Sequence, residues 1–144
     1  MLTDKGPKVL EFNCRFGDPE TQVILPRLET PLSEIIHAIG ESSLNKIDIK
    51  WNNNPAVCLI AASEGYPIEY EKGKLITGLD KIKNSIIFHA GTEIVNKKHY
   101  TSGGRVLGVT AQSNTIENAR QLAYKDIEKI TFEGIYYRTD IANI

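Results

Sequence analysis

The stretch KVLEFNCRFGDPETQ, residues 8–22, gives the first indication of the fold. Apolar and polar side chains mix over residues 8–13, and Gly6-Pro7 just before them is typical of a turn, so we predict a strand there. Side chains two positions apart on a strand share a face. We therefore expect Glu11 and Asn13 to point to the same side.

Two helices are predicted after this strand. Asp18 is suited to cap the first, with Pro19 as its first residue, because the N–H that proline lacks has no helical partner at that position. Pro26 should distort this helix. A second helix should begin at Pro31 and end near Gly40, with apolar side chains at three-four spacing at Leu32, Ile35, Ile36 and Ile39.

The remainder of the chain has the pattern of an antiparallel sheet. The polar residues 41–55 indicate a domain junction. Short apolar runs separated by turns that contain glycine predict strands at 57–62, 86–89, 93–97, 105–112 and 134–138. One helix interrupts the strands: Asn114 should cap it with Glu117 reaching back, and its apolar stripe consists of Ile116, Ala119, Ala123, Ile127 and Ile130. We predict an α+β fold in which residues 1–45 end one region, and residues 46–144 form a small antiparallel sheet with one packed helix.

Composition restricts the possible functions. The 144 residues are 41% hydrophobic and 24% charged, which is typical of a globular chain. A net charge of -1 argues against nucleic acid or an anionic membrane surface as a partner, and no apolar run approaches the ~20 residues that span a bilayer. Cys14 and Cys58 form no CxxC motif, so neither a disulfide framework nor a zinc site is expected, and a reduced cytoplasmic location follows.

The densest polar cluster lies in the first stretch, and it consists of Glu11, Asn13, Arg15, Asp18 and Glu20. Glu11 and Asn13 would offer two oxygen ligands on one strand face, which suits a hard cation such as Mg²⁺ held together with phosphates. Arg15 would stabilise negative charge on a transferring phosphoryl group or an acyl phosphate. The alternative is a solvated edge strand that leads into a helix cap.

The string EFNCRFGDPETQ, residues 11–22, closely resembles the signature of the phosphoribosylamine–glycine ligase family. The resemblance covers nearly the whole chain. It continues in Ala62-Ser63-Glu64-Gly65-Tyr66-Pro67, Phe88-His89-Ala90-Gly91-Thr92, Thr101-Ser102-Gly103-Gly104-Arg105-Val106-Leu107-Gly108-Val109 and Tyr136-Tyr137-Arg138-Thr139-Asp140-Ile141.

The resemblance implies an ATP-grasp ligase of purine biosynthesis. Such an enzyme joins glycine to 5-phosphoribosylamine through glycyl phosphate, while ATP becomes ADP and phosphate. The resemblance makes Glu11 and Asn13 ligands of Mg²⁺ or Mn²⁺, and it places Arg15 at the reacting phosphate and carboxylate. Asp18 and Glu20 would either contact substrate or serve the start of the helix.

Members of the family are much longer, so the chain resembles a carboxy-terminal fragment. Residues 1–45 then end the ATP-grasp region, and residues 46–144 form the terminal domain. Because most of the ATP site is absent, we expect no catalysis by this chain alone. The alternative is a non-catalytic binding or interaction module with the same fold. A piece of a larger domain should expose the apolar side chains Val9, Leu10 and Phe12, whereas a self-contained module should not.

Two further candidates have an open interpretation. Ser102-Gly103-Gly104-Arg105 would either present backbone N–H groups to an anion or form a tight hairpin turn. His89 ends a predicted strand, where it would either touch substrate or serve the structure. No partner for His37 or His99 can be identified from the sequence.

Overall fold

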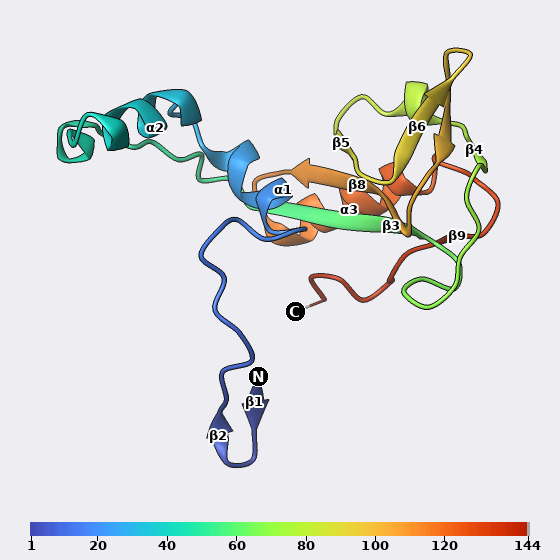
Figure 1. Cartoon of the computed structure of the whole chain (residues 1–144), viewed down its shortest axis with the longest axis horizontal. Helices are drawn as coiled ribbons and strands as arrows, with labels where there is room; N and C mark the ends of the chain where they lie inside the picture. The colour runs from blue at the N-terminus through green and yellow to red at the C-terminus, as the bar shows by residue number, and fades with distance from the viewer. Residues whose placement is uncertain (144) are drawn as a thin grey trace.

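A four-stranded antiparallel sheet forms the centre of the computed structural model, which describes residues 1–143 (Figure 1). Its long middle strands are β3 (Ala56–Ser63) and β8 (Arg105–Gln112), which pair from Ala56 opposite Gln112 to Ala62 opposite Arg105. The flanking strands are β5 (Ile86–His89), beside β8, and β9 (Ile135–Tyr136), beside β3. The prediction of antiparallel strands is confirmed for all of these pairs.

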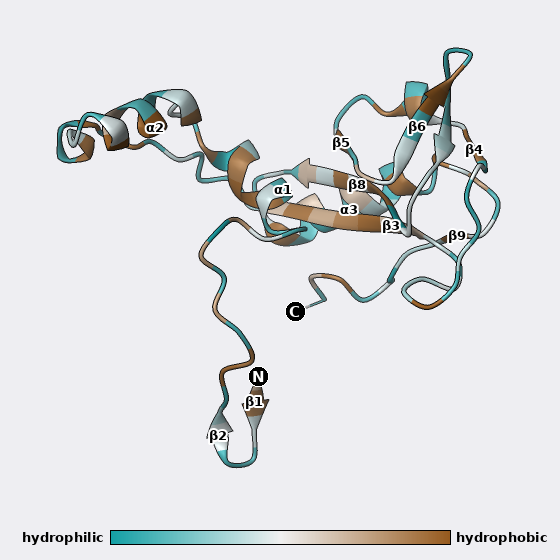
Figure 2. Ribbon diagram, in the orientation of Figure 1, coloured by the Kyte–Doolittle hydropathy of each residue, from teal (hydrophilic) through white to brown (hydrophobic). Residues whose placement is uncertain are grey.

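The helix α3 (Ile116–Ile127) packs against β3 and β8 and closes the main core. Alternate residues of β3, namely Val57, Leu59 and Ala61, are buried in one cluster with Ala119, Ala123 and Ile127 of the helix. The two long strands are mostly apolar along their length (Figure 2). The predicted stripe is confirmed from Ala119 to Ile130, while Ile116 at its start is 40% exposed.

The predicted cap of α3 is wrong by one residue. The side chain of Thr115, not Asn114, accepts the hydrogen bond from the backbone N–H of Asn118, at 3.1 Å. Glu117 does not reach back, because its carboxylate accepts a hydrogen bond from Gln121 instead. The Asn114 side chain accepts from the Asn118 amide group, so the two asparagines bond to each other.

A second, smaller sheet has the strand order β4 (Leu75–Ile76), β7 (Lys98–Thr101) and β6 (Thr92–Val95). The predicted strand at 93–97 overran its end, because Asn96 and Lys97 have φ of 50° and 64° and turn the chain into β7. β4 and β7 were not predicted, since neither has an apolar run of strand length. A short 3-10 helix, η3 (Leu79–Lys81), follows β4. The predicted strand at 134–138 is also shorter, because β9 consists of Ile135–Tyr136 alone.

Four short helices precede β3. They are α1 (Thr21–Ile24), the 3-10 helix η1 (Leu25–Arg27), α2 (Leu32–Gly40) and the 3-10 helix η2 (Leu44–Lys46). The predicted second helix is confirmed as α2, and the distortion at Pro26 is confirmed by the change to 3-10 geometry. The predicted start of the first helix is wrong. α1 begins at Thr21, without a side-chain cap, because the Asp18 carboxylate bonds to Arg105 and Gln22 instead.

Residues 1–16 extend away from the packed domain as an arm (Figure 1). A small hairpin of β1 (Leu2–Thr3) and β2 (Gly6–Pro7) ends it. The predicted strand at 8–13 is wrong for this chain, because these residues have no neighbouring strand among residues 1–143 to complete a ladder. No helix within residues 1–143 has both the length and the apolar character that crossing a membrane requires.

Candidate functional site

Glu11, Asn13 and Arg15 line one side of the extended arm and contact one another in sequence order. The side-chain amide of Asn13 donates to Glu11 Oε1 at 3.1 Å, and Arg15 Nη1 donates to Asn13 Oδ1 at 3.1 Å. The expectation that Glu11 and Asn13 share a face is confirmed by this contact. All three residues are exposed. The arm therefore presents a carboxylate, an amide and a guanidinium group in one row to whatever lies beside it.

This row fits part of a site for a hard cation. Carboxylate and amide oxygens are the ligand types that Mg²⁺ and Mn²⁺ prefer, and Mg²⁺ commonly takes one or two protein ligands with the rest from phosphates and water. Two oxygen-bearing side chains match that pattern and fall short of a complete protein cage. Within residues 1–143 there is no group of three or more His, Cys, Asp or Glu side chains arranged to hold a metal ion.

Asp18 joins the arm to the packed domain. Its carboxylate lies 3.2 Å from Arg105 Nη2, and Arg105 Nη1 donates to the Asp18 backbone carbonyl at 3.0 Å. Gln22 donates to the other carboxylate oxygen at 2.8 Å. The Arg105 and Asp18 side chains are 40% and 49% exposed, so the ion pair itself contributes at most about 1 kcal/mol. The main effect of the pair is therefore to fix the direction in which the arm extends from the packed domain, and its contribution to stability is small.

A second attachment lies under α1. The hydroxyl of Thr110, on β8, donates to the backbone carbonyl of Gln22 at 3.0 Å. In a continuous helix that carbonyl would accept from the residue four positions later, which is Pro26 and has no N–H. Thr110 therefore supplies the hydrogen bond that the proline removes. Burial is the main reason why the pKa of the neighbouring Cys58 thiol is raised.

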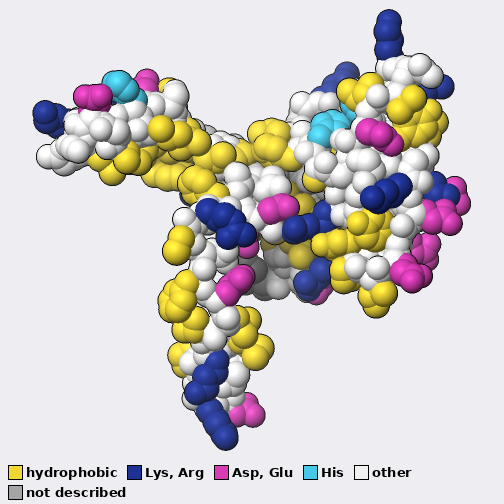
Figure 3. All heavy atoms as spheres, in the orientation of Figure 1, with side chains coloured by type: hydrophobic (Ala, Val, Ile, Leu, Met, Phe, Trp, Pro, Cys, Tyr) yellow, Lys and Arg dark blue, Asp and Glu magenta, His cyan; other side chains and the backbone are white. Residues whose placement is uncertain are grey.

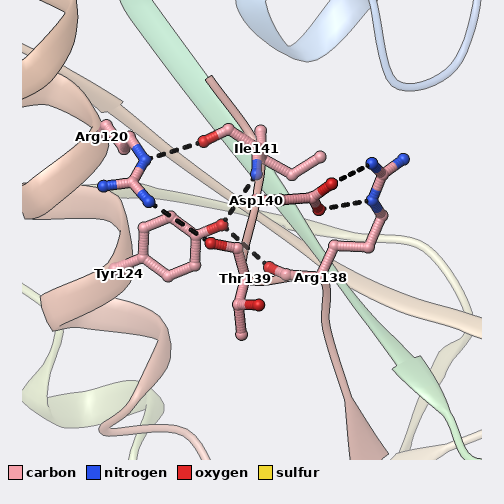
Figure 4. Close-up of polar contacts among 6 residues, drawn as sticks. All are labelled: Arg120, Tyr124, Arg138, Thr139, Asp140 and Ile141. Atoms are coloured by element: carbon pink, nitrogen blue, oxygen red, sulfur yellow. Dashed lines mark hydrogen bonds and ion pairs between the residues drawn. The ribbon is translucent and has the colours of Figure 1, made fainter. Parts of the chain in front are cut away.

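A cavity of about 280 Å³ lies beside the Asp18–Arg105 pair. Pro19 and Arg105 line it, together with Ile60 of β3 and the chain from Tyr136 to Arg138. Two side chains of α3 hold the carboxy-terminal segment that lines the cavity (Figure 4). The Tyr124 hydroxyl donates to the Arg138 carbonyl at 2.9 Å, and Arg120 Nε donates to the Ile141 carbonyl at 2.9 Å. Arg138 makes two hydrogen bonds to Asp140, of 2.8 and 2.6 Å, and this pairing lowers the pKa of the Asp140 carboxyl.

The loop of residues 102–104 is not a hairpin turn, because it connects β7 of the small sheet to β8 of the large one. Its glycines allow close packing instead. A Cβ on Gly104 would lie 2.0 Å from the Tyr66 ring, and one on Gly91 would lie 2.6 Å from Gly103 Cα. The loop carbonyls accept hydrogen bonds from Ser63, at 2.8 Å from its N–H and 3.1 Å from its hydroxyl. The hairpin alternative is therefore wrong, and no observation supports an anion cradle.

His89 has a partner that the sequence did not identify. Its ring stacks on His99 of β7, with centroids 4.8 Å apart, and its Nδ1 lies 3.0 Å from the Thr92 hydroxyl. Partial burial and the neighbouring His99 ring lower the pKa of His89. The pair joins the two sheets at the end of β5 and lies apart from the row of Glu11, Asn13 and Arg15 in sequence and in its contacts.

Three residues that position the site were missed by sequence reasoning: Arg105, Thr110 and Tyr124. Arg105 was predicted to end the loop of residues 102–105 and to begin the strand at 105–112, and its partner Asp18 is 87 positions away. Thr110 lies within an apolar strand, where a lone threonine gives no signal of a partner. The one available signal was Pro26, which predicts that the carbonyl four residues earlier needs another donor.

Comparison with known proteins gives two matches along the chain. Residues 56–144 match the family model described as "Phosphoribosylglycinamide synthetase, C domain". Residues 1–21, which include the row of Glu11, Asn13 and Arg15, match "Phosphoribosylglycinamide synthetase, ATP-grasp (A) domain". The residues between them, 22–55, fall outside both matches.

The chain is also similar to full-length proteins. It is 56% identical over 142 residues to a phosphoribosylamine–glycine ligase of Caldanaerobacter subterraneus subsp. tengcongensis, over 99% of this chain and 34% of that protein. It is 53% identical over 142 residues to a bifunctional purine biosynthetic protein of Dictyostelium discoideum, over 96% of this chain and 17% of that protein. The crystal structure of a phosphoribosylamine–glycine ligase from Thermotoga maritima superposes with a TM-score of 0.74 at 39% identity, over 99% of this chain and 35% of that one. The chain thus spans about a third of the length of the ligases it matches.

Proposed function

Because its residues 56–144 match the C domain, this chain belongs to the phosphoribosylglycinamide synthetase family, and we propose that it acts as the carboxy-terminal part of a phosphoribosylamine–glycine ligase. The proposed reaction has two steps. The carboxylate of glycine attacks the γ-phosphate of ATP, which releases ADP and forms glycyl phosphate. The amine of 5-phosphoribosylamine then attacks the glycyl carbonyl, and phosphate leaves.

In this proposal Glu11 and Asn13 hold Mg²⁺ or Mn²⁺ together with the phosphates of ATP. The cation would neutralise charge on the phosphates during transfer. The contact of 3.1 Å between the two side chains supports this role, since both side chains lie on the same side of the arm. Asn13 would hold the ion through its side-chain oxygen, which accepts a hydrogen bond from Arg15 in this structure, and Arg15 would then be free to contact substrate.

Arg15 is proposed to act on the reacting groups. Its guanidinium group presents several N–H donors in a fixed plane, which matches the oxygens of a phosphoryl group or an acyl phosphate. Such donors accelerate a reaction when they contact charge that grows in the transition state. The hydrogen bond to Asn13 Oδ1 keeps Arg15 on the same side of the arm as the proposed metal ligands.

One observation carries the proposal: the row of Glu11, Asn13 and Arg15 lies on the segment that matches an ATP-grasp domain, and residues 56–144 match the C domain of the same enzyme. The alternative of a self-contained binding module is less well supported. Val9, Leu10 and Phe12 are 71%, 75% and 86% exposed, as expected for a segment that belongs to a larger domain. The same proposal places the boundary between the ATP-grasp region and the terminal domain at residue 45, and it places the protein in the cytoplasm.

A chimaeric enzyme tests the proposal. The matching third of the Caldanaerobacter ligase is replaced by residues 1–144 of this chain, and ADP release is measured with glycine, 5-phosphoribosylamine and Mg-ATP. Glu11→Ala and Asn13→Ala should each lower the rate by about 100-fold, with a raised Mg²⁺ requirement. Arg15→Ala should lower kcat more than it weakens ATP binding.

The matched control is Asp4→Ala, an exposed carboxylate on the same arm whose loss should leave the rate unchanged. An active chimaera whose kinetics are unaffected by Glu11→Ala and Asn13→Ala would remove the metal-ligand proposal. An effect of Arg15→Ala on KM alone would contradict its role in the transition state.

A further inference from the structure

The cavity of about 280 Å³ beside the Asp18–Arg105 pair has no role in the reaction as described so far. Its charged lining is entirely basic: Arg105 and Arg138 contribute to the wall, and no carboxylate of residues 1–143 does. Three tyrosines also line it: Tyr66, Tyr136 and Tyr137. Apolar side chains such as Ile60 complete the lining. This lining favours a small ligand that has an anionic group and an uncharged ring.

Both arginines of the cavity have N–H groups that remain available to a ligand. Arg138 uses Nε and Nη2 to bond to Asp140, and Arg105 uses Nη1 and Nη2 to contact Asp18. The remaining nitrogens, Arg138 Nη1 and Arg105 Nε, have no acceptor in the part of the chain that the structure describes. The two carboxylates hold the guanidinium planes in place. Arginine held in this way is well suited to bind phosphate oxygens through charge-assisted hydrogen bonds.

The wall that carries Arg138 is held by α3 (Figure 4). The Tyr124 hydroxyl donates to the Arg138 carbonyl at 2.9 Å and accepts from the Ile141 N–H at 3.2 Å. Arg120 donates to the carbonyls of Thr139, at 3.3 Å, and Ile141, at 2.9 Å. The Arg120 guanidinium group also lies 4.9 Å from the centre of the Tyr124 ring. This wall is therefore in place before a ligand arrives, which lowers the entropic cost of binding.

The tyrosines of the cavity present surface that suits a sugar. Tyr66 and Tyr136 are 41% and 60% exposed. Tyr66 is fixed from two sides, because its ring packs against Gly104, where a Cβ would collide with it, and lies edge-on to Tyr70 with centroids 5.9 Å apart. A tyrosine offers an apolar ring face together with a polar hydroxyl. A pentose has the matching combination of C–H groups and hydroxyls.

We propose that this cavity binds a pentose 5-phosphate, with the phosphate at Arg105 and Arg138 and the sugar ring against the tyrosines. This inference rests on the proposed function, in which 5-phosphoribosylamine is such a sugar phosphate. The size of the cavity agrees with it. About 280 Å³ lies just below the ~300–1,000 Å³ of pockets that take drug-sized ligands, so a smaller ligand fits.

The cavity is also close to the candidate site on the arm. Arg105 lines the cavity and pairs with Asp18 at the base of the arm. Arg15 lies three residues before Asp18, so at most about 11 Å of extended chain separates them. Figure 3 shows Lys and Arg side chains on both sides of the recess between the arm and the packed domain. A sugar phosphate in the cavity would thus have its phosphate at the packed domain and its other end toward the arm.

An NMR titration of the 144-residue chain with ribose 5-phosphate tests the inference. Backbone amides of residues 136–139 should shift, with a dissociation constant of about 1 mM. Arg138→Gln should weaken binding by about 10-fold or more, because it removes charge-assisted hydrogen bonds to the phosphate. The Arg138 side chain is 63% exposed, so the fold should be retained. The matched control is Lys83→Gln, which removes one positive charge from an exposed side chain outside the cavity and should leave the affinity unchanged.

A second variant separates the sugar from the phosphate. Tyr136→Leu should weaken the binding of ribose 5-phosphate several-fold and leave the weaker binding of inorganic phosphate unchanged. Inorganic phosphate that binds as tightly as ribose 5-phosphate would overturn the inference, because the cavity would then be a general anion site. AMP that binds more tightly would overturn it too, because a nucleotide would then be the occupant. Amide shifts confined to residues outside the cavity, or unchanged affinity in Arg138→Gln, would also contradict it.

The ligase chimaera described above adds a kinetic readout. Arg138→Gln should raise the KM for 5-phosphoribosylamine by about 10-fold and leave the KM for Mg-ATP unchanged. The two proposals fail separately. Binding of ribose 5-phosphate in the cavity, combined with a folded but inactive chimaera, refutes the proposed function alone. An active chimaera whose KM values are unaffected by Arg138→Gln refutes the sugar-phosphate site alone.

Discussion

Replacing Thr110 by valine should weaken the attachment of α1, and with it of the arm that carries the candidate site, to the central sheet. Thr110 is 1% exposed, and its hydroxyl donates at 3.0 Å to the Gln22 carbonyl. Valine keeps the shape of threonine and removes only the donor. Because Pro26 has no N–H, the Gln22 carbonyl then has no replacement donor within its helix.

The expected cost follows from that unmatched carbonyl. It faces the buried Thr110 side chain, and an acceptor left without a partner away from water costs about 1–3 kcal/mol. Urea denaturation of the 144-residue chain measures it. With a slope of roughly 2 kcal/mol per M for a chain of this size, the midpoint should fall by about 0.5–1.5 M with the slope unchanged.

The variant Pro26→Ala provides the control, because it restores a backbone N–H four residues after Gln22. In that background Thr110→Val should cost less, and the coupling between the two substitutions should be about 1 kcal/mol. The reasoning is refuted if Thr110→Val leaves the midpoint unchanged, or if its cost is the same with proline and with alanine at position 26.

Two other perturbations test the packed domain. Gly91→Ala should destabilise it by about 1–3 kcal/mol or more, because the new Cβ would lie 2.6 Å from the Arg105 carbonyl and 2.6 Å from Gly103 Cα, and backbone atoms cannot move aside. Thermal denaturation measures the loss. Gly40→Ala is the control, because a Cβ at Gly40 meets nothing within 4 Å. Equal melting temperatures of the Gly91→Ala and Gly40→Ala variants would contradict the packing argument. Asp126 is buried, which by itself raises its pKa, but its hydrogen bonds to Lys129 and Ser85 outweigh burial and the pKa is lowered. The Asp126 carboxylate should therefore contribute its full stability above the unfolded pKa of about 3.9, and this contribution should disappear as the pH falls below that value. Asp126→Asn should flatten the pH dependence of the urea midpoint in that range. An unchanged pH profile would show that the carboxylate is not the group responsible.

Periodicity was sufficient where an element carries its own packing. β3 and β8 are long apolar runs that pair along most of their length, and both were predicted within one or two residues. The buried positions of α3 follow a regular helical stripe, so they were predicted too, although its cap was assigned one residue early.

Periodicity failed where the structure depends on a partner distant in sequence. The residues 8–13 have the composition of a strand and lack a neighbour to pair with among residues 1–143. Asp18 was expected to cap a helix, and it bonds to Arg105 across 87 positions instead. The stacking of His89 on His99 depends on β7, which has no strand-like apolar run. In each case a long-range contact outweighs the local preference.

For the candidate site, the sequence predicted which residues share a side of the arm and could not predict what holds the arm in place. Glu11 and Asn13 are two positions apart on an extended chain, so their contact follows from backbone geometry alone. The attachment through Thr110 and Gln22 joins residues 88 positions apart. Such a pairing becomes visible only when the sheet that carries Thr110 is folded.

The most direct test of the central claim is the rate of ADP release by the chimaeric ligase that carries residues 1–144 of this chain. The account predicts an active chimaera that depends on glycine and 5-phosphoribosylamine, that loses about 100-fold in rate with Glu11→Ala or Asn13→Ala, and that keeps its rate with Asp4→Ala. A folded chimaera without activity, or one that is equally active with and without Glu11 and Asn13, would contradict it.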